Sequence, residues 1–193
     1  MMDMIVGIDP GLSGAVAAIH LPPEVGRLDC AVAVWDIPTK AKKAGRQRMV
    51  VRNMVDADEL VKVFEQIEGK VGRHETTTVV MEQVTSGSGQ GVSSVFSLGD
   101  TFGTLRGVCA ALGMNLVLVR PQLWKAYWEL SEDKNASLAL ARRKFGDIDE
   151  LARKKDHNRA EALLIALWYA DSIGSLTKNP TLDYVGDMYF GRR

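Results

Sequence analysis

The feature that most constrains the fold of this chain is an apolar run near its start that reaches a carboxylate and then turns. Residues 5–19 read IVGIDPGLSGAVAAI, so Asp9 ends a strand-like segment and Pro10 and Gly11 follow at once. Proline and glycine favour a turn, and the apolar pattern that resumes at residue 14 predicts a second strand in a hairpin with the first. Asp9 is therefore either a turn-former or a group that the strand holds in place for chemistry.

The rest of the chain alternates strand-like and helix-like segments. Further strands are expected at 29–38, 76–84 and 114–121, and helices at 54–70, 92–113, 121–130, 131–146 and 156–175. This order predicts an α/β domain over residues 1–175, with early antiparallel strands, later parallel strands and helices on both faces of a five-stranded mixed sheet. The basic stretch 40–52 and the glycine-rich stretch 85–91 are expected to be loops, and residues 176–193 a loosely ordered tail.

Composition places the chain among ordinary globular proteins. It has 193 residues, and no apolar run reaches the roughly 18–20 residues of a membrane helix. The first ten residues lack the pattern of a signal peptide, so no membrane partner is expected. The two cysteines, Cys30 and Cys109, lie in apolar surroundings and are expected to be buried free thiols in the cytoplasm.

Positive charge is unevenly distributed, although the formal net charge is zero. The stretch 40–52 contains no acid, and its basic residues are Lys40, Lys42, Lys43, Arg46, Arg48 and Arg52. Residues 141–145 and 152–159 form two further basic clusters. These clusters are either solvated faces or one side of the molecule that binds a polyanion such as DNA.

Acidic residues stand at the predicted ends of three elements. Asp9 ends the first strand and Glu82 the fourth, and the carboxyl ends of strands are where open α/β sheets bind ligands. The last helix opens with Asp156 and His157, and Glu161 lies on the same helix face as His157. Taken singly, each acid is also explained as a turn former, a helix cap or a solvated surface residue.

Converging carboxylates repel one another unless a cation lies between them. Hard oxygen ligands select Mg²⁺ or Mn²⁺, and a pair of such ions activates water and stabilises a leaving oxygen. If the acids meet, the pattern favours hydrolysis of a phosphodiester.

Three segments together resemble the RuvC-type Holliday junction resolvases, and the phage and prophage members of that group are the most similar. The segments are IVGIDPGLSGAV, VVMEQV and KKDHNRAEALLIALW, and the resemblance runs from residue 4 to about residue 172. It implies a ribonuclease H-like fold and a homodimer. It also implies an endonuclease of DNA recombination and repair that makes paired nicks in four-way or branched DNA, with two Mg²⁺ or Mn²⁺ ions in each site.

The resemblance also assigns roles to residues. The family's metal-binding acids are matched by Asp9, Glu82 and Glu161. Asn158 stands where cellular relatives carry Asp or His, so the fourth ligand would be Asp156 or His157, or the site would have fewer ligands.

Lysines that lie near the scissile phosphate in the family correspond to Lys125 and Lys134. Further DNA contacts are expected from Lys42, Lys43, Arg46 and Arg48. Thr85 stands at the position of a family aromatic residue, whose role Phe96 could take.

Three other interpretations stay open at this point. The segment GIDPGLSGA also resembles the first phosphate loop of actin-like ATPases, but no second such loop is evident, and GSGQG lacks the lysine of a P-loop. No nucleotide cofactor is therefore expected. The chain could instead be a ribonuclease H-like nuclease that acts on RNA or on an RNA–DNA hybrid, or a non-catalytic protein that binds junctions.

Overall fold

A computed structural model gives the structure of the chain. It describes residues 4–20, 31–42, 52–71, 77–85, 89–131 and 133–174, and the structural statements below refer to these residues. Cys30 and the predicted tail 176–193 lie outside them, so the expectations for both stay predictions.

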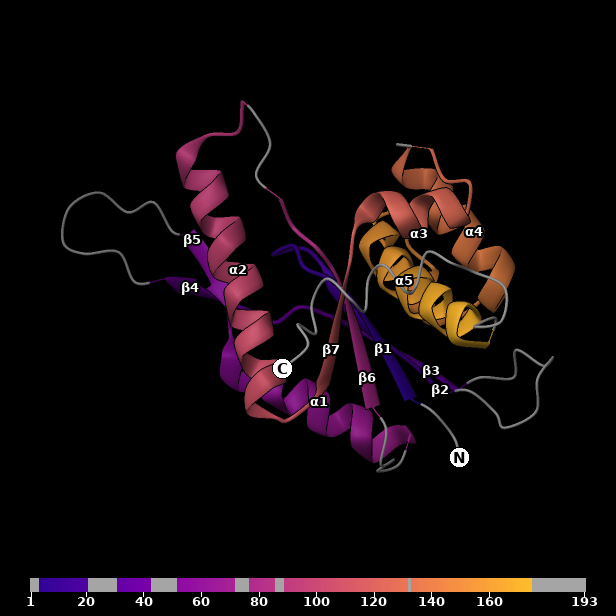
Figure 1. Ribbon diagram of the computed structural model, residues 1–193, viewed down its shortest axis with the longest axis horizontal. Helices are drawn as coiled ribbons and strands as arrows, with labels where there is room; N and C mark the ends of the chain where they lie inside the picture. Colours follow the sequence, from indigo (N-terminus) through magenta and orange to yellow (C-terminus); the bar gives the residue numbers. More distant parts are fainter. Residues whose placement is uncertain are drawn as a thin grey trace, which may run out of the picture.

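The centre of the molecule is the five-stranded mixed sheet that the sequence predicts. Its strands are β1 (Met4–Asp9), β2 (Ala15–His20), β3 (Ala31–Asp36), β6 (Thr77–Glu82) and β7 (Asn115–Val119). The strand order is β3-β2-β1-β6-β7 (Figure 1). The pairs β1–β2 and β2–β3 are antiparallel, whereas β6 runs parallel to both β1 and β7.

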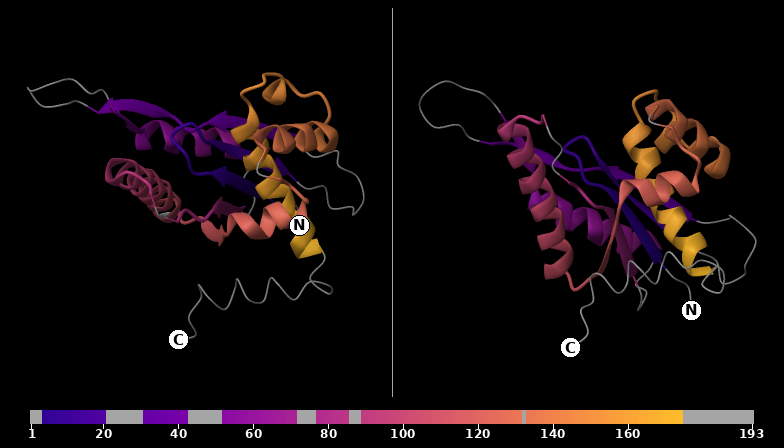
Figure 2. Two further views of the ribbon diagram at one scale, coloured as in Figure 1. Left: turned by 90° about the horizontal axis from the view of Figure 1, so that it is seen from above. Right: turned by 45° about the horizontal axis from the view of Figure 1, so that its top comes forward.

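Helices cover both faces of this sheet, as expected (Figures 1 and 2). One face carries α1 (Ala57–Val71) and α2 (Val92–Ala111), and the other carries α3 (Pro121–Tyr127), α4 (Lys134–Phe145) and α5 (His157–Gly174). A short 3₁₀ turn, η1 (Asp149–Leu151), precedes α5. Alternation along the strands sends side chains into two separate cores, one on each face.

Helix α1 buries four apolar residues at the spacing of one helix face: Leu60, Val63, Phe64 and Ile67. The backbone N–H of Glu59 donates to the Asp56 carboxylate at 3.5 Å, as at a helix N-cap. The helix ends at Val71, one residue beyond the range predicted from the sequence.

The last helix, α5, is not amphipathic in its central part. Residues 162–168 are buried without interruption, so α5 is apolar on every side in its central part. The cause is its position between the sheet and the pair α3 and α4, which leaves this part no solvent-facing side.

The basic stretch 40–52 is only partly a loop. β4 (Thr39–Lys42) and β5 (Arg52–Val55) form a two-stranded antiparallel sheet, and β5 packs beside α2 (Figure 1). The Asp56 N–H donates to the Pro38 carbonyl at 2.9 Å and closes the base of this hairpin. Charged residues are tolerated on an exposed two-stranded sheet, which is why composition alone indicated a loop. Residues 43–51 lie outside the described ranges.

Two smaller expectations concern burial and membranes. Cys109 is a buried free thiol as predicted, and burial raises its pKa to about 11. No helix in the described part of the chain is long and apolar enough to cross a membrane.

Candidate active site

Asp9 and Glu82 occupy adjacent positions at the carboxyl edge of the sheet. Ile8 is in register with Met81 in the parallel pair β1–β6, so the next residues along the two strands are these acids. The chain makes a tight turn after Asp9 that brings the Gly14 backbone against the Asp9 carbonyl. A Cβ added to Gly14 would lie 2.0 Å from that carbonyl oxygen. Glycine is therefore required at this turn, and the strands that end in Asp9 and Glu82 are neighbours in the sheet.

Helix α5 brings Glu161 to the same edge. The backbone of α5 lies against β1 at Gly7. A Cβ added to Gly7 would fall 2.0 Å from the Ala162 carbonyl oxygen of the helix. One turn nearer its start, the Asn158 amide donates to the backbone carbonyl and the hydroxyl of Ser13, in the loop that follows Asp9. The helix thus contacts the chain at Gly7, before Asp9, and at Ser13, after it. Glu161 lies between the helix residues that make these contacts, so it stands beside the end of β1. We call Asp9, Glu82 and Glu161 together the acidic edge.

Glu82 is held in a partly buried environment. The indole N–H of Trp124, on α3, donates to its Oε2 at 2.8 Å. Burial raises the pKa of Glu82, the Trp124 hydrogen bond and the Lys125 charge lower it, and the Glu161 charge raises it, with a net upward shift. The charges of Lys125 and Glu161 therefore act on Glu82, as expected of groups in one site.

Glu161 has two protein partners. The Ser137 hydroxyl, on α4, donates to Oε1 at 3.1 Å, and Lys125 Nζ lies 3.6 Å from the same oxygen. The Ser137 residue is 2% exposed, so its hydroxyl is part of the interior rather than the surface. Lys125 thus lies among the acids, at the predicted place for a cation that contacts a phosphate.

Asp156 lies in a different setting from the acidic edge. Its carboxylate is 1% exposed and accepts hydrogen bonds from the Arg153 N–H at 2.7 Å and from Arg153 Nε at 2.9 Å. Burial would raise its pKa, but the hydrogen bonds from Arg153 and the charges of Arg153 and Arg159 outweigh burial and lower it. Arg159 pairs in turn with Asp36 at 2.6 Å, at the end of β3. This cluster fixes the start of α5, and His157 begins that helix, partly buried.

The basic residues predicted to contact DNA are only partly described. Lys42 ends β4 and Lys134 begins α4, but their side chains lie outside the description, as do Lys43, Arg46 and Arg48 altogether. In the cluster 141–145, Arg142 donates to the carbonyls of Leu151 and Ala152, so it has a structural role. Thr85 and Phe96 are both exposed, and Phe96 keeps 67% of its surface accessible.

Within the described ranges, no group of three or more His, Cys, Asp or Glu side chains is arranged to hold a metal ion. Glu82 and Glu161 instead accept hydrogen bonds from Trp124 and Ser137. The donor chemistry nevertheless fits a hard divalent cation, because carboxylate oxygens are what Mg²⁺ and Mn²⁺ prefer. Trp124 and Ser137 would act as the outer partners that orient such ligands.

Sequence reasoning missed both of these outer partners. The only local signal is that a serine stands at a buried position of α4 and a tryptophan directly before Lys125.

The strand order and the helices on both faces define a ribonuclease H-like fold. No protein-family model matches the chain. RuvC of Thermus thermophilus has the same fold. Its structure in complex with Holliday junction substrate superposes with a TM-score of 0.52 and 17% identity, over 89% of this chain and 95% of that one. A second RuvC structure from T. thermophilus gives 0.51 and 18% identity, over 90% and 97%.

A curated relative shares sequence with part of the chain. It is the "Holliday junction resolvase MOC1, chloroplastic" of Chlamydomonas reinhardtii, 42% identical over 79 residues. The match spans 39% of this chain and 8% of the relative's length. The resemblance to RuvC-type resolvases that the motifs predict is thus confirmed, and with it the fold.

Proposed function

We propose that this chain is an endonuclease of the RuvC type that cuts four-way or branched DNA with the acidic edge. The observation that carries the proposal is the position of three carboxylates from β1, β6 and α5 at one end of the sheet. Lys125 offsets part of the mutual repulsion of such a set, and a divalent cation would offset the rest.

Asp9, Glu82 and Glu161 would hold the metal, with His157 as a further candidate ligand. Two bound Mg²⁺ or Mn²⁺ ions would supply an activated water and charge stabilisation for the leaving oxygen. Lys125 holds the scissile phosphate by charge without reading sequence, and Trp124 and Ser137 fix the two glutamates. A site that combines three acids with a lysine suits hydrolysis of a phosphodiester better than binding of DNA alone.

Branched DNA is proposed as the substrate because both kinds of relative point to it. The fold is that of a RuvC solved with Holliday junction substrate, and the partial sequence match is to a protein named as a Holliday junction resolvase. Basic residues beyond the acidic edge would bind the phosphates of the DNA backbone, so the affinity for DNA should fall steeply as the salt concentration rises.

Paired nicks require two active sites, so we further propose a homodimer. Helix α2 supplies a suitable face: Val92 and Phe96 are exposed by 86% and 67%, and Gly99, Gly103 and Gly107 would have no neighbour within 4 Å of an added Cβ. Sedimentation of the intact chain and of Gly103→Arg tests this face, because the bulky charge should yield a monomer.

The test of the activity uses three labelled substrates: a four-way junction, a linear duplex and an RNA–DNA hybrid, each with and without Mg²⁺. We expect symmetric nicks in the junction alone, only with Mg²⁺, and none with Asp9→Asn or Glu161→Gln. Glu65→Gln is the matched control, since Glu65 is an exposed glutamate on α1, on the other face of the sheet.

Two outcomes would replace the proposal. Preferred cutting of the hybrid would make the chain a ribonuclease H-like enzyme that acts on RNA. Tight junction binding without cutting, unchanged by Asp9→Asn, would make it a non-catalytic junction-binding protein.

A further inference from the structure

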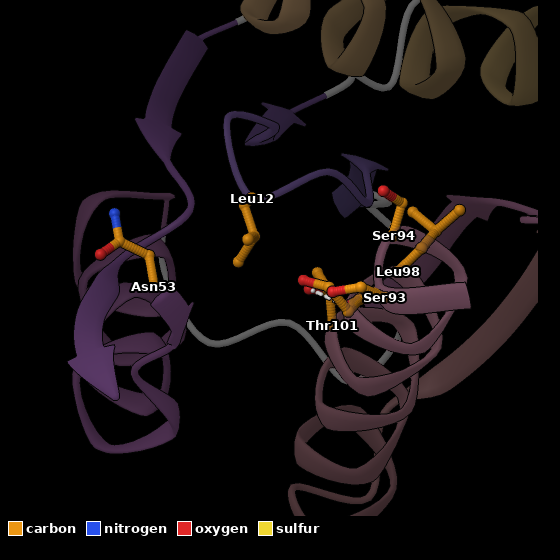
Figure 3. A pocket seen from close by; sticks show the side chains of 7 residues that line it. Leu12, Asn53, Ser93, Ser94, Leu98 and Thr101 are labelled. Atoms are coloured by element: carbon orange, nitrogen blue, oxygen red, sulfur yellow. Dashed lines mark hydrogen bonds between the residues drawn. The ribbon is translucent and has the colours of Figure 1, made fainter. Parts of the chain in front are cut away.

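A pocket lies against the loop that follows Asp9 and is used by none of the roles given above. Its volume is about 370 Å³, near the lower end of the range for small-molecule sites. It opens between the loop after Asp9, strand β5 and the first half of α2 (Figure 3). The lining residues are Leu12, Asn53, Ser93, Ser94, Ser97, Leu98 and Thr101.

The lining is neutral, and it combines apolar walls with hydrogen-bonding groups. Leu12 extends into the space between Asn53 and the side chains of α2 (Figure 3). Within the described chain, no hydrogen bond occupies the hydroxyls of Ser93 and Ser94 or the amide of Asn53, whereas Thr101 is bonded to a backbone carbonyl of its own helix. Among the residues that the structure describes, none of those that line the pocket is charged, so this part of the lining does not suit a phosphate.

These properties match a nucleobase. A base has two apolar faces and a polar edge, and enzymes that handle a base outside the helix stack its faces and hydrogen-bond its edge. The Asn53 amide offers a donor and an acceptor together, and the serine hydroxyls can do either. Leu12 is three residues beyond Asp9 in the same loop, so the pocket and the acidic edge share one loop of the chain.

We propose that this pocket binds one unstacked base of the branched DNA and thereby sets the nucleotide preference of cutting. The proposal rests on the proposed function and adds a site of base selection to it. A hydrogen-bonded base edge discriminates by about 1–3 kcal/mol, which corresponds to about 5- to 150-fold in rate between bases.

The first experiment measures nicking rates on four junctions that differ only in the base beside the cut, and on a fifth that is abasic there. We expect one base to be cut at least 5-fold faster than the others and the abasic junction to be cut slowly. Asn53→Ala should reduce this preference, and Ser94→Trp, which fills the pocket, should abolish it, so that all five junctions are nicked at the slow rate of the abasic junction. Asn115→Ala is the matched control, because Asn115 is an exposed asparagine at the start of β7, away from the pocket.

A second readout needs no cutting. 2-Aminopurine is placed in turn at each position around the branch point, and its fluorescence is followed as the intact protein binds without divalent metal. We expect one position to change on binding, and Ser94→Trp to remove that change while still binding the junction.

The outcomes separate the two proposals. If no junction is nicked by the intact protein with Mg²⁺, the proposed function fails and the pocket proposal falls with it. If all five junctions are nicked at equal rates, or if the preference survives both pocket variants, the function stands and the base-binding pocket is refuted.

Discussion

Replacing Gly7 by alanine should separate α5 from β1 and thereby move Glu161. Gly7 lies in the middle of β1, and an added Cβ would fall 2.0 Å from the Ala162 carbonyl oxygen and 2.8 Å from the Ala166 nitrogen. Both contacts are with helix backbone, so no side-chain rotation relieves them. The methyl group therefore displaces the helix or bends the strand.

The size of the displacement follows from the contact distance. Ordinary van der Waals contacts begin at 3.4 Å, so the backbone must separate by about 1.4 Å at this point. Overpacking of this kind costs about 1–3 kcal/mol in unfolding free energy. A misplacement of about 1 Å in a catalytic group costs about 100-fold in rate. Since Glu161 directly precedes Ala162, we expect Gly7→Ala to lose about 100-fold in junction cleavage at saturating substrate.

The assay combines urea unfolding with cleavage at a temperature where the variant is folded by circular dichroism. Gly69→Ala is the matched control, because a Cβ at Gly69 has nothing within 4 Å and helix interiors favour alanine over glycine by roughly 0.5–1 kcal/mol. It should be slightly more stable and fully active. A folded Gly7→Ala protein with wild-type stability and cleavage rate would refute the close approach of α5 to β1 and the placement of Glu161 that depends on it.

Three further predictions concern the partners of the acids. Trp124→Phe removes the 2.8 Å hydrogen bond to Glu82 and should raise the Mg²⁺ concentration for half-maximal cleavage by about 10- to 100-fold. An unchanged Mg²⁺ titration would show that this bond does not orient Glu82. Glu82→Gln should stabilise the protein in EDTA, and this gain in unfolding free energy should grow as pH rises. The folded-state pKa of Glu82 is raised, so the stability that its protonated form contributes is complete below pH 4.5 and is lost as pH rises through the folded-state pKa. A constant difference in unfolding free energy between variant and wild type, measured by urea unfolding from pH 4 to pH 8, would contradict this. Asp156→Asn should lower the unfolding free energy by about 1–3 kcal/mol at neutral pH. The loss should be near the lower end of this range, because Arg153, its partner, is half exposed. The variant should still cleave junctions. This stability contribution should disappear as pH falls through the lowered folded-state pKa of Asp156, and a stable but inactive Asp156→Asn protein would instead identify Asp156 as a metal ligand.

The features that were predictable from the sequence are those encoded locally or by simple topology. The strands that end at Asp9 and Glu82 are continuous apolar runs, and their parallel pairing follows from the helix-connected order of the chain. The position of Glu161 was predictable in outline, because its helix is strongly apolar and must pack on the sheet.

The features that could not be predicted depend on contacts between distant segments. The bond from Trp124 to Glu82 joins residues 42 positions apart, and the bond from Ser137 to Glu161 joins residues 24 apart. The β4–β5 hairpin was missed because its basic composition resembles that of a solvated loop. The buried state of Asp156 was missed because a helix-start acid gives no local sign that arginines enclose it.

The most direct test of the acidic edge is a crystal structure of the protein with Mn²⁺, with the metal located by its anomalous scattering. We expect an anomalous peak at the ends of β1 and β6, with Asp9, Glu82 and Glu161 as ligands. Lys125 should then lie close to that peak without coordinating it. Peaks found only elsewhere, with these three carboxylates directed away from one another at saturating Mn²⁺, would show that the acidic edge is not a metal site.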